Sequence, residues 1–544
     1  MIIRKKLPRA RLNGEPLLHP DHPRPVTRRQ MLAAGLIGSQ AYVMLPSALF
    51  GILGKPRDAQ AQLASDISSL VSQCGISTTG ANKIPFICFD LAGGANLNGS
   101  EALIGQSGGQ LDFLSTAGYG LLGLPGDMLP NSPNKASPSG NFISTALGLA
   151  WHSDGAILRG IQSIASAATQ ANVNGAAIPA VSSTDTQDNP HNPMYGIWMA
   201  GAQGALLNLI GTEATVSGGN SMAPAALINL TEIPSVITQA SDCTGLVNTG
   251  ALGTMFTDPN DAVQVLESTA RISGGTNLAA LSGKLGNVSV FPGDSATDLS
   301  TKAAMQCAYA KTAALVNTFG NPASLNPDLD TNIVGGANSI FTAAQYQNSN
   351  IQATAAVMKM VVSGFAAAGT IVLNGYDYHD STRATGETQN FNAGVCIGAV
   401  LEYAKRMGKP VMVYVFSDGS LVSTMMADNS VAGRGKYGWQ GDSQVVASTF
   451  FLVYNPAGRP TLMQGGSGNQ IGYNNSDGSV NTSSSPASNA VNLLVNTVCL
   501  NYMALHNQAG NFASVFGTAN GLGTTASQLD PLIALNPICN GTIG

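Results

Sequence analysis

The stretch that decides the fold begins with Thr370-Ile371-Val372-Leu373-Asn374-Gly375 and ends with Val411-Met412-Val413-Tyr414-Val415-Phe416. Both runs are short, apolar and rich in β-branched residues, which predicts two buried strands. Between them, residues 394–407 predict a helix that ends before Gly408 and Pro410, because apolar residues recur there at helical spacing. Strand, helix and strand in this order are typical of a right-handed βαβ unit. We therefore expect a three-layer α/β core with a mostly parallel sheet.

Further apolar runs extend the predicted sheet on both sides of this unit. They predict strands at residues 84–90, 177–181, 225–230 and 449–454. Polar, glycine-rich segments predict loop insertions, among them residues 464–486, which are rich in Gly, Asn and Ser and have no hydrophobic period. Residues 62–544 are expected to form a single large α/β domain.

The N-terminal segment has the features of an export signal. A basic leader precedes Thr27-Arg28-Arg29-Gln30-Met31-Leu32, and a weakly apolar run then continues to about Leu53. This order predicts a twin-arginine signal peptide over residues 1–61, cleaved after Ala61, and a periplasmic or extracellular protein. Glycine, glutamine and proline interrupt the apolar run, so we expect no permanent membrane anchor after cleavage.

Charge is scarce and becomes more acidic once the leader is removed. The leader holds 10 of the 25 basic residues but 3 of the 30 acidic ones, which leaves a net charge of −12 on the mature chain. Such a surface repels phosphate backbones, so nucleic acid is excluded as a partner. Charged residues are only 10% of the chain, which also contains 63 glycines. Because few charges oppose self-association, the protein could form a homo-oligomer.

The seven cysteines include no Cys-x-x-Cys pair, which disfavours zinc ribbons and thioredoxin-like redox chemistry. Cys88 and Cys396 lie in apolar runs and are expected to pack as small hydrophobic residues. The others lie where an oxidising compartment could pair them. Proximity alone suggests two pairs, Cys243 with Cys307 and Cys499 with Cys539.

Acidic residues follow three of the predicted strands and could hold a metal ion. Asp90, Asp377 and Asp418 each come directly after an apolar run, and His379 lies two residues beyond Asp377. Because parallel strands end at one edge of a sheet, these side chains are expected to converge there as ligands of a divalent ion such as zinc, calcium or magnesium. The alternative for each acid is a turn former or a helix cap.

A nucleophile is harder to identify from the sequence. No Gly-x-Ser-x-Gly elbow is present. Ser183 and Thr184, in the polar loop that leads to His191, are the best candidates.

Several of these motifs together resemble a known exported family. The twin-arginine leader, Phe89-Asp90-Leu91-Ala92-Gly93-Gly94-Ala95-Asn96, Trp151-His152-Ser153 and Gly375-Tyr376-Asp377-Tyr378-His379 occur in the order found in the family of domain of unknown function 1501. That family is usually grouped with the alkaline phosphatase and sulfatase superfamily. The resemblance implies an alkaline-phosphatase-like core with divalent metals at the strand ends.

Two departures from the family pattern bear on catalysis. Gln440-Gly441-Asp442-Ser443 stands where the family has Thr-Asp-His-Gly, and Asn189-Pro190-His191 replaces its Ser-His element. A two-metal phosphatase needs about six ligands and a nucleophile, so the loss of an imidazole and a serine weighs against activity.

Two functions follow from the sequence. The first is a divalent-metal-dependent hydrolase that acts on small anionic phosphate or sulfate esters. The second is a catalytically reduced surface or extracellular scaffold that self-associates or binds a partner. Whether the protein is an enzyme stays open at this level.

Overall fold

The computed structural model describes residues 63–74, 83–132, 137, 139–183, 189–246, 259–319, 322–465 and 468–543. The expected signal peptide and the candidate nucleophile Thr184 lie outside the described residues. Within these ranges, no helix combines the length and the apolar character needed to cross a membrane.

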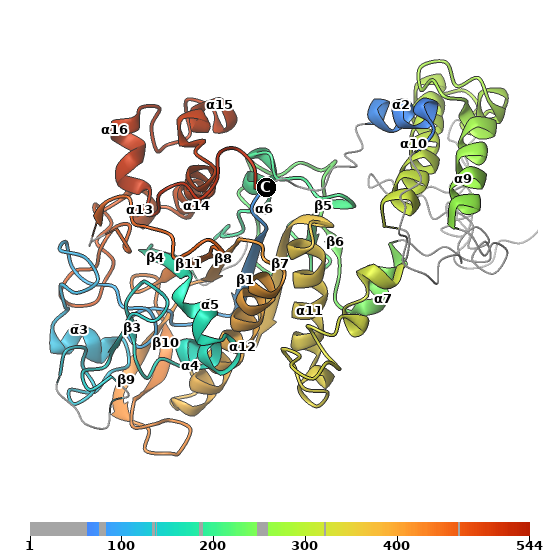
Figure 1. Cartoon of the computed structure of the whole chain (residues 1–544). Helices are drawn as coiled ribbons and strands as arrows, with labels where there is room; N and C mark the ends of the chain where they lie inside the picture. Colours follow the sequence, from blue (N-terminus) through green and yellow to red (C-terminus); the bar gives the residue numbers. More distant parts are fainter. Residues whose placement is uncertain are drawn as a thin grey trace, which may run out of the picture.

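A seven-stranded sheet forms the centre of the protein (Figure 1). Its strand order is β4-β11-β8-β1-β7-β5-β6, and every neighbouring pair is parallel except the two that involve β11. The strands are β1 (Phe86–Ala92), β4 (Val173–Pro179), β5 (Leu207–Gly211), β6 (Ser235–Val236), β7 (Ala366–Asn374), β8 (Val411–Ser417) and β11 (Ser448–Tyr454). The expectation of a mostly parallel sheet is confirmed.

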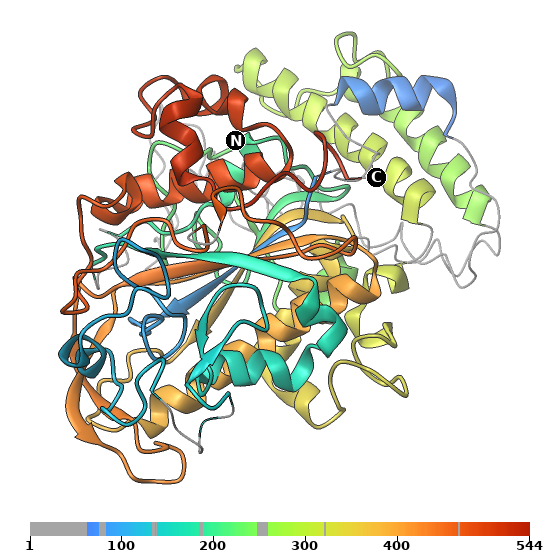
Figure 2. The ribbon, with the colours of Figure 1, turned by 60° about the vertical axis from the view of Figure 1, so that its left-hand side comes forward.

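Helices cover both faces of this sheet and complete three layers (Figure 2). One face carries α4 (Ala156–Ile164), α11 (Ser349–Val362) and α12 (Ala384–Arg406), and the other carries α6 (Met194–Met199) and α14 (Val491–Leu505). Strand β1 is buried because its alternate side chains enter opposite layers. Ile87 and Phe89 pack in the first layer, and Phe86 and Cys88 in the second. The three-layer α/β core is thus confirmed.

The strands predicted from apolar runs are mostly present. Strands β1, β7, β8 and β11 correspond to the strands expected at 84–90, 370–375, 411–416 and 449–454. Strand β4 corresponds to the one expected at 177–181 but begins earlier in the chain. The helix expected at 394–407 is the second half of α12. The strand expected at 225–230 is wrong, because Pro224 starts a turn in which Leu227 N donates to Pro224 O over 2.8 Å. The edge of the sheet is built by β5 and β6 instead.

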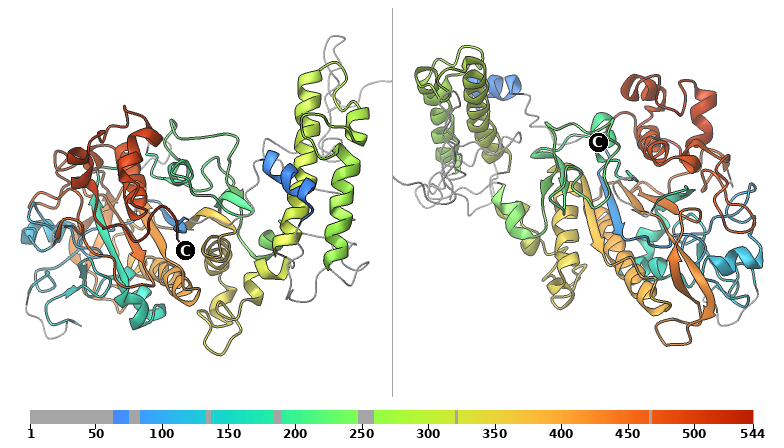
Figure 3. Two further views of the ribbon diagram at one scale, coloured as in Figure 1. Left: turned by 45° about the horizontal axis from the view of Figure 1, so that its top comes forward. Right: turned by 180° about the vertical axis from the view of Figure 1, so that it is seen from behind.

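Three helices form a smaller apolar cluster beside the α/β core (Figure 3). Helix α2 (Ser65–Gln73) packs Ile67 and Leu70 against α9 (Pro259–Gly274) and α10 (Ser295–Phe319). Arg271 of α9 donates to both carboxylate oxygens of Asp66, over 2.6 and 2.8 Å. These contacts hold the first described helix against a helical pair that lies about 200 residues later in the chain.

A disulfide between Cys74 and Cys307 joins the end of α2 to α10. Both pairings suggested by proximity in the sequence are therefore wrong. Cys243, Cys499 and Cys539 are free thiols, and Cys243 and Cys499 are buried among packed helices. Helix packing decides the pairing, because a disulfide forms only where two Cα atoms come within about 7 Å. Cys88 and Cys396 are buried free thiols, as expected.

A buried histidine connects α14 to the start of β1. Ile84 N donates to His506 Nε2 over 2.9 Å, and His506 Nδ1 lies 2.7 Å from Tyr502 O. Because Nε2 accepts a hydrogen bond, the proton of the neutral ring belongs on Nδ1, where it is donated to the carbonyl. Burial, together with the charge of Lys83, lowers the pKa of His506 to about 4.

We expect His506 to contribute to acid unfolding. An unfolded histidine titrates near pH 6.5, so from about pH 6.5 to about pH 4 the unfolded chain takes up a proton that the folded protein refuses. Stability should fall with decreasing pH in this window by up to roughly 3 kcal/mol from His506 alone. Urea unfolding at several pH values should show a shallower pH dependence for His506→Gln. A variant that loses stability as steeply as the wild type would contradict this assignment.

Candidate metal centre

The loops that follow β1, β7 and β8 meet at one edge of the sheet, as their parallel direction requires. Gly93 lies between the other two loops. Its N–H donates to Asp418 Oδ1 over 2.9 Å, and a Cβ on Gly93 would lie 2.5 Å from Asp377 N. Gly93 also has a φ of +124°, which other residues rarely adopt. Glycine is thus required where the three loops touch.

Residues 376–379 continue in an extended form in which alternate side chains are buried and exposed. Tyr376 donates its hydroxyl proton to Gln389 O over 2.8 Å. Tyr378 is equally buried and donates to Asn390 Oδ1 over 3.0 Å. The side chains of Asp377 and His379 are therefore directed outward, with 63% and 42% of their surface exposed.

A third ligand candidate comes from the hairpin of β9 (Leu421–Ala427) and β10 (Tyr437–Asp442). The backbone of β10 pairs with the segment after His379, because Ser381 N donates to Trp439 O over 2.8 Å and Trp439 N donates to Thr382 O over 3.0 Å. This pairing brings Asp442, the last residue of β10, to the same place as Asp377 and His379.

Asp377, His379 and Asp442 form a cluster that could hold a metal ion, because one ligand atom from each lies within 4.8 Å of the others. His379 Nε2 and Asp377 Oδ1 are 2.7 Å apart. Two ligands of a tetrahedral ion at bond lengths of about 2.1 Å would lie roughly 3.4 Å apart, so this pair must open by about 0.7 Å to admit an ion. All three side chains are exposed, which leaves room for that movement.

Asp418 and Asp90 lie deeper than this cluster. Burial raises the pKa of Asp418, and the negative charges of Asp377 and Asp442 add to the shift. Asp90 accepts hydrogen bonds from Ser221 N over 2.6 Å and from Ser221 Oγ over 3.4 Å. Burial raises its pKa to about 7, with a further contribution from Asp418. The pKa of each acid is therefore raised by the charge of a neighbouring aspartate. The role of Asp90 and Asp418 as metal ligands stays a prediction.

The loop after β4 contributes a serine and a histidine to the same edge. Ser182 Oγ lies 2.7 Å from His191 Nε2 and accepts hydrogen bonds from Asn189 Nδ2 over 2.6 Å and from Gly419 N over 3.0 Å. Burial lowers the pKa of His191 to about 3, so its ring is neutral and Nε2 can accept a hydrogen bond from the serine hydroxyl. Ser183, the candidate from the sequence, is the next residue and is partly buried.

The sequence interpretation missed Asp442 and Ser182 for different reasons. Asp442 lies in a segment that lacks the histidine of the family pattern, so the sequence does not single it out as a ligand. Ser182 gives no local signal, because its histidine is nine residues away and the loop between them has no motif.

A buried ionic network joins the start of α12 to the start of β10. Lys436 Nζ is 2.8 Å from Glu387 Oε1, and Arg383 Nε donates to the same oxygen over 2.9 Å. Asp154 accepts a pair of hydrogen bonds from Arg434 and lies 3.4 Å from Lys436. Of the two elements that the network connects, β10 carries Asp442 at its opposite end.

Comparison with family models, with curated proteins and with solved structures yields no match.

We expect the cluster to bind a divalent ion with its three side chains acting together. Replacing His379 by Ala, or Asp377 or Asp442 by Asn, should weaken zinc binding at least about tenfold, because each change removes one of three ligands. A competition titration with a chromophoric chelator measures this affinity. Asp294→Asn removes a carboxylate that is also exposed but lies outside the cluster, and it should bind zinc like the wild type. Equal affinity in all four variants would contradict the site.

Proposed function

We propose that the protein is an exported, metal-dependent hydrolase of small phosphate or sulfate esters. The observation that carries the proposal is the cluster of Asp377, His379 and Asp442 at the carboxyl edge of a parallel sheet. The resemblance of Gly375-Tyr376-Asp377-Tyr378-His379 to the family of domain of unknown function 1501 supports the same chemistry.

Export is proposed from the twin-arginine segment and is supported by the disulfide. Cys74 and Cys307 pair across 233 residues, and such bonds persist in oxidising compartments rather than in a reducing cytoplasm. The proposed location is the periplasm or the extracellular space.

Zinc is the metal we propose for this centre. One imidazole and two carboxylates suit zinc, whereas calcium and magnesium prefer oxygen ligands alone. A bound zinc ion would polarise an ester oxygen and leave a coordination position open for the substrate. The three protein ligands would hold the ion at the surface of the sheet edge, where a small anionic ester can reach it.

The nucleophile is proposed in the segment that contains Ser182, Ser183 and Thr184. Ser182 is favoured over the original candidates because its hydroxyl already contacts a neutral histidine at 2.7 Å. Hydrogen bonds from Gly419 N and Asn189 Nδ2 would stabilise negative charge on Ser182 Oγ.

Hydrolysis of p-nitrophenyl phosphate and p-nitrophenyl sulfate by the zinc-loaded protein tests this proposal. We expect turnover of one ester and a loss of at least about 100-fold in kcat/KM for His379→Ala and for Ser182→Ala, because one removes a ligand and the other the nucleophile. Asp294→Asn should retain wild-type activity. A protein that binds zinc tightly but hydrolyses neither ester would contradict the proposed hydrolase activity.

The second candidate function is a non-catalytic surface protein that self-associates. The β9–β10 hairpin favours it, because Val431 at its tip is 98% exposed and Met426 on β9 is 68% exposed. An exposed apolar hairpin tip is a common feature of association surfaces, and the chain has few charges to oppose contact.

We expect association through the hairpin to be concentration-dependent and sensitive to charge. If the tip mediates contact, Val431→Asp should weaken self-association at least about tenfold, because it places a charge in an apolar interface. Sedimentation equilibrium over a range of concentrations measures this, with Val288→Asp, at a valine on the three-helix side that is 52% exposed, as the control. A wild-type protein that stays monomeric throughout would exclude this second function.

A further inference from the structure

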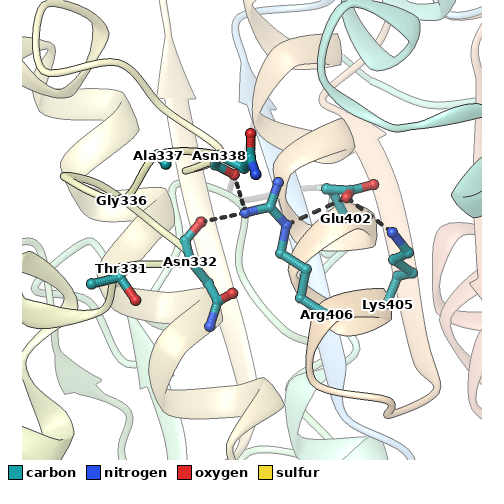
Figure 4. A pocket seen from close by; sticks show the side chains of 8 residues that line it. All are labelled: Thr331, Asn332, Gly336, Ala337, Asn338, Glu402, Lys405 and Arg406. Atoms are coloured by element: carbon teal, nitrogen blue, oxygen red, sulfur yellow. Dashed lines mark hydrogen bonds and ion pairs between the residues drawn. The ribbon is translucent and has the colours of Figure 1, made fainter.

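A pocket of about 620 Å³ opens at the far end of α12 from the metal cluster. It lies between the last turn of α12 and the loop that contains residues 331–338 (Figure 4). Helix α12 has 23 residues, so at 1.5 Å per residue about 33 Å separate its two ends. The pocket is therefore independent of the candidate metal centre.

Arg406 is held rigidly across this pocket. Its Nη1 donates to Asn332 O over 2.9 Å and to Asn338 O over 2.6 Å, and its Nε lies 3.4 Å from Glu402 Oε1. Figure 4 shows the guanidinium between the loop and the helix, with Nη2 making none of the drawn contacts. Within the described part of the chain, Nη2 has no hydrogen-bond partner, so a fixed donor remains for a ligand.

Lys405 supplies a second positive charge at the same place. Its Nζ is 3.6 Å from Glu402 Oε1, and 39% of the side chain is exposed. This contact is too long for a strong hydrogen bond, so the ammonium group can turn toward a ligand at little cost.

The one carboxylate in the pocket is already engaged with the protein. Glu402 Oε2 accepts hydrogen bonds from Ser166 N over 3.0 Å and from Thr169 Oγ1 over 2.5 Å, which anchors the start of α5 (Ala167–Ala171). Its other oxygen faces both Arg406 and Lys405. One carboxylate against two cations leaves the pocket with a net positive charge.

That positive charge is unusual on this chain, which keeps 15 basic residues against 27 acidic ones once the expected leader is removed. The remaining lining is neutral and polar, with the amides of Asn332 and Asn338 and the hydroxyl of Thr331. We propose that this pocket is a binding site for a small oxyanion-bearing solute, a carboxylate or a phosphate, held by Arg406 Nη2 and Lys405 Nζ. The proposal does not depend on the proposed hydrolase activity.

Calorimetric titration of the metal-free protein with inorganic phosphate and with succinate tests the proposal. We expect saturable binding of at least one probe at low ionic strength, weakened by added salt because the contacts are charged. Lys405→Gln and Arg406→Gln should each weaken binding about tenfold, since each removes a charge-assisted hydrogen bond.

Lys409→Gln is the matched control, because it removes the same charge from an exposed site just beyond α12 and outside the pocket lining. It should bind both probes like the wild type. Lys405 makes no hydrogen bond to the 331–338 loop, so its variant should fold even if Arg406→Gln loosens that loop.

Three outcomes would overturn the proposal. They are absence of saturable binding of either probe, equal weakening by Lys409→Gln, and loss of binding in His379→Ala but not in Lys405→Gln. The last result would place the anion at the metal cluster. If the protein binds the anion but hydrolyses neither ester, the proposed hydrolase function is contradicted, whereas the proposed anion site is supported.

Discussion

The buried ion pair between Lys436 and Glu387 is the constraint that holds the β9–β10 hairpin against α12. The Lys436 side chain is completely buried, and its Nζ lies 2.8 Å from Glu387 Oε1. A buried ammonium group is strongly unfavourable unless a carboxylate compensates it, so the two residues must stay together. Lys436 directly precedes β10, and Glu387 lies in the first turn of α12. Their contact therefore fixes the start of β10, the strand that ends at Asp442, against α12.

The other charges around this pair make the arrangement more rigid. Arg383 donates to Glu387 and to Ser100 Oγ, and its guanidinium lies 4.5 Å from the centre of the Trp439 ring. Arg434 and Lys436 together compensate Asp154. Each group in the network has partners on a different chain segment, so removal of one leaves an uncompensated charge among the rest. The network is thus a rigid buried layer, whereas the side chains of the candidate metal cluster are exposed.

Parts of this centre were visible in the sequence. The sequence singled out Asp377 and His379 as ligand candidates beyond a predicted strand, and the parallel sheet implied that Asp90, Asp377 and Asp418 lie at one edge. Asp442 joins them only through the pairing of Trp439 with Ser381 and Thr382, which no local pattern encodes. Ser182 meets His191 for a similar reason, because the fold of the loop after β4 decides that contact.

The sequence by itself determined the α/β class, the parallel core and the strand ends at which polar residues gather, because hydrophobic periodicity is a local property of the chain. It did not determine the Cys74–Cys307 pairing, the absence of a strand at 225–230 or the depth of Asp90 and Asp418. These features depend on contacts between segments that are far apart in the chain, and their free energy arises only when the layers pack. Tertiary structure therefore decided which acidic side chains are exposed together and which are buried apart.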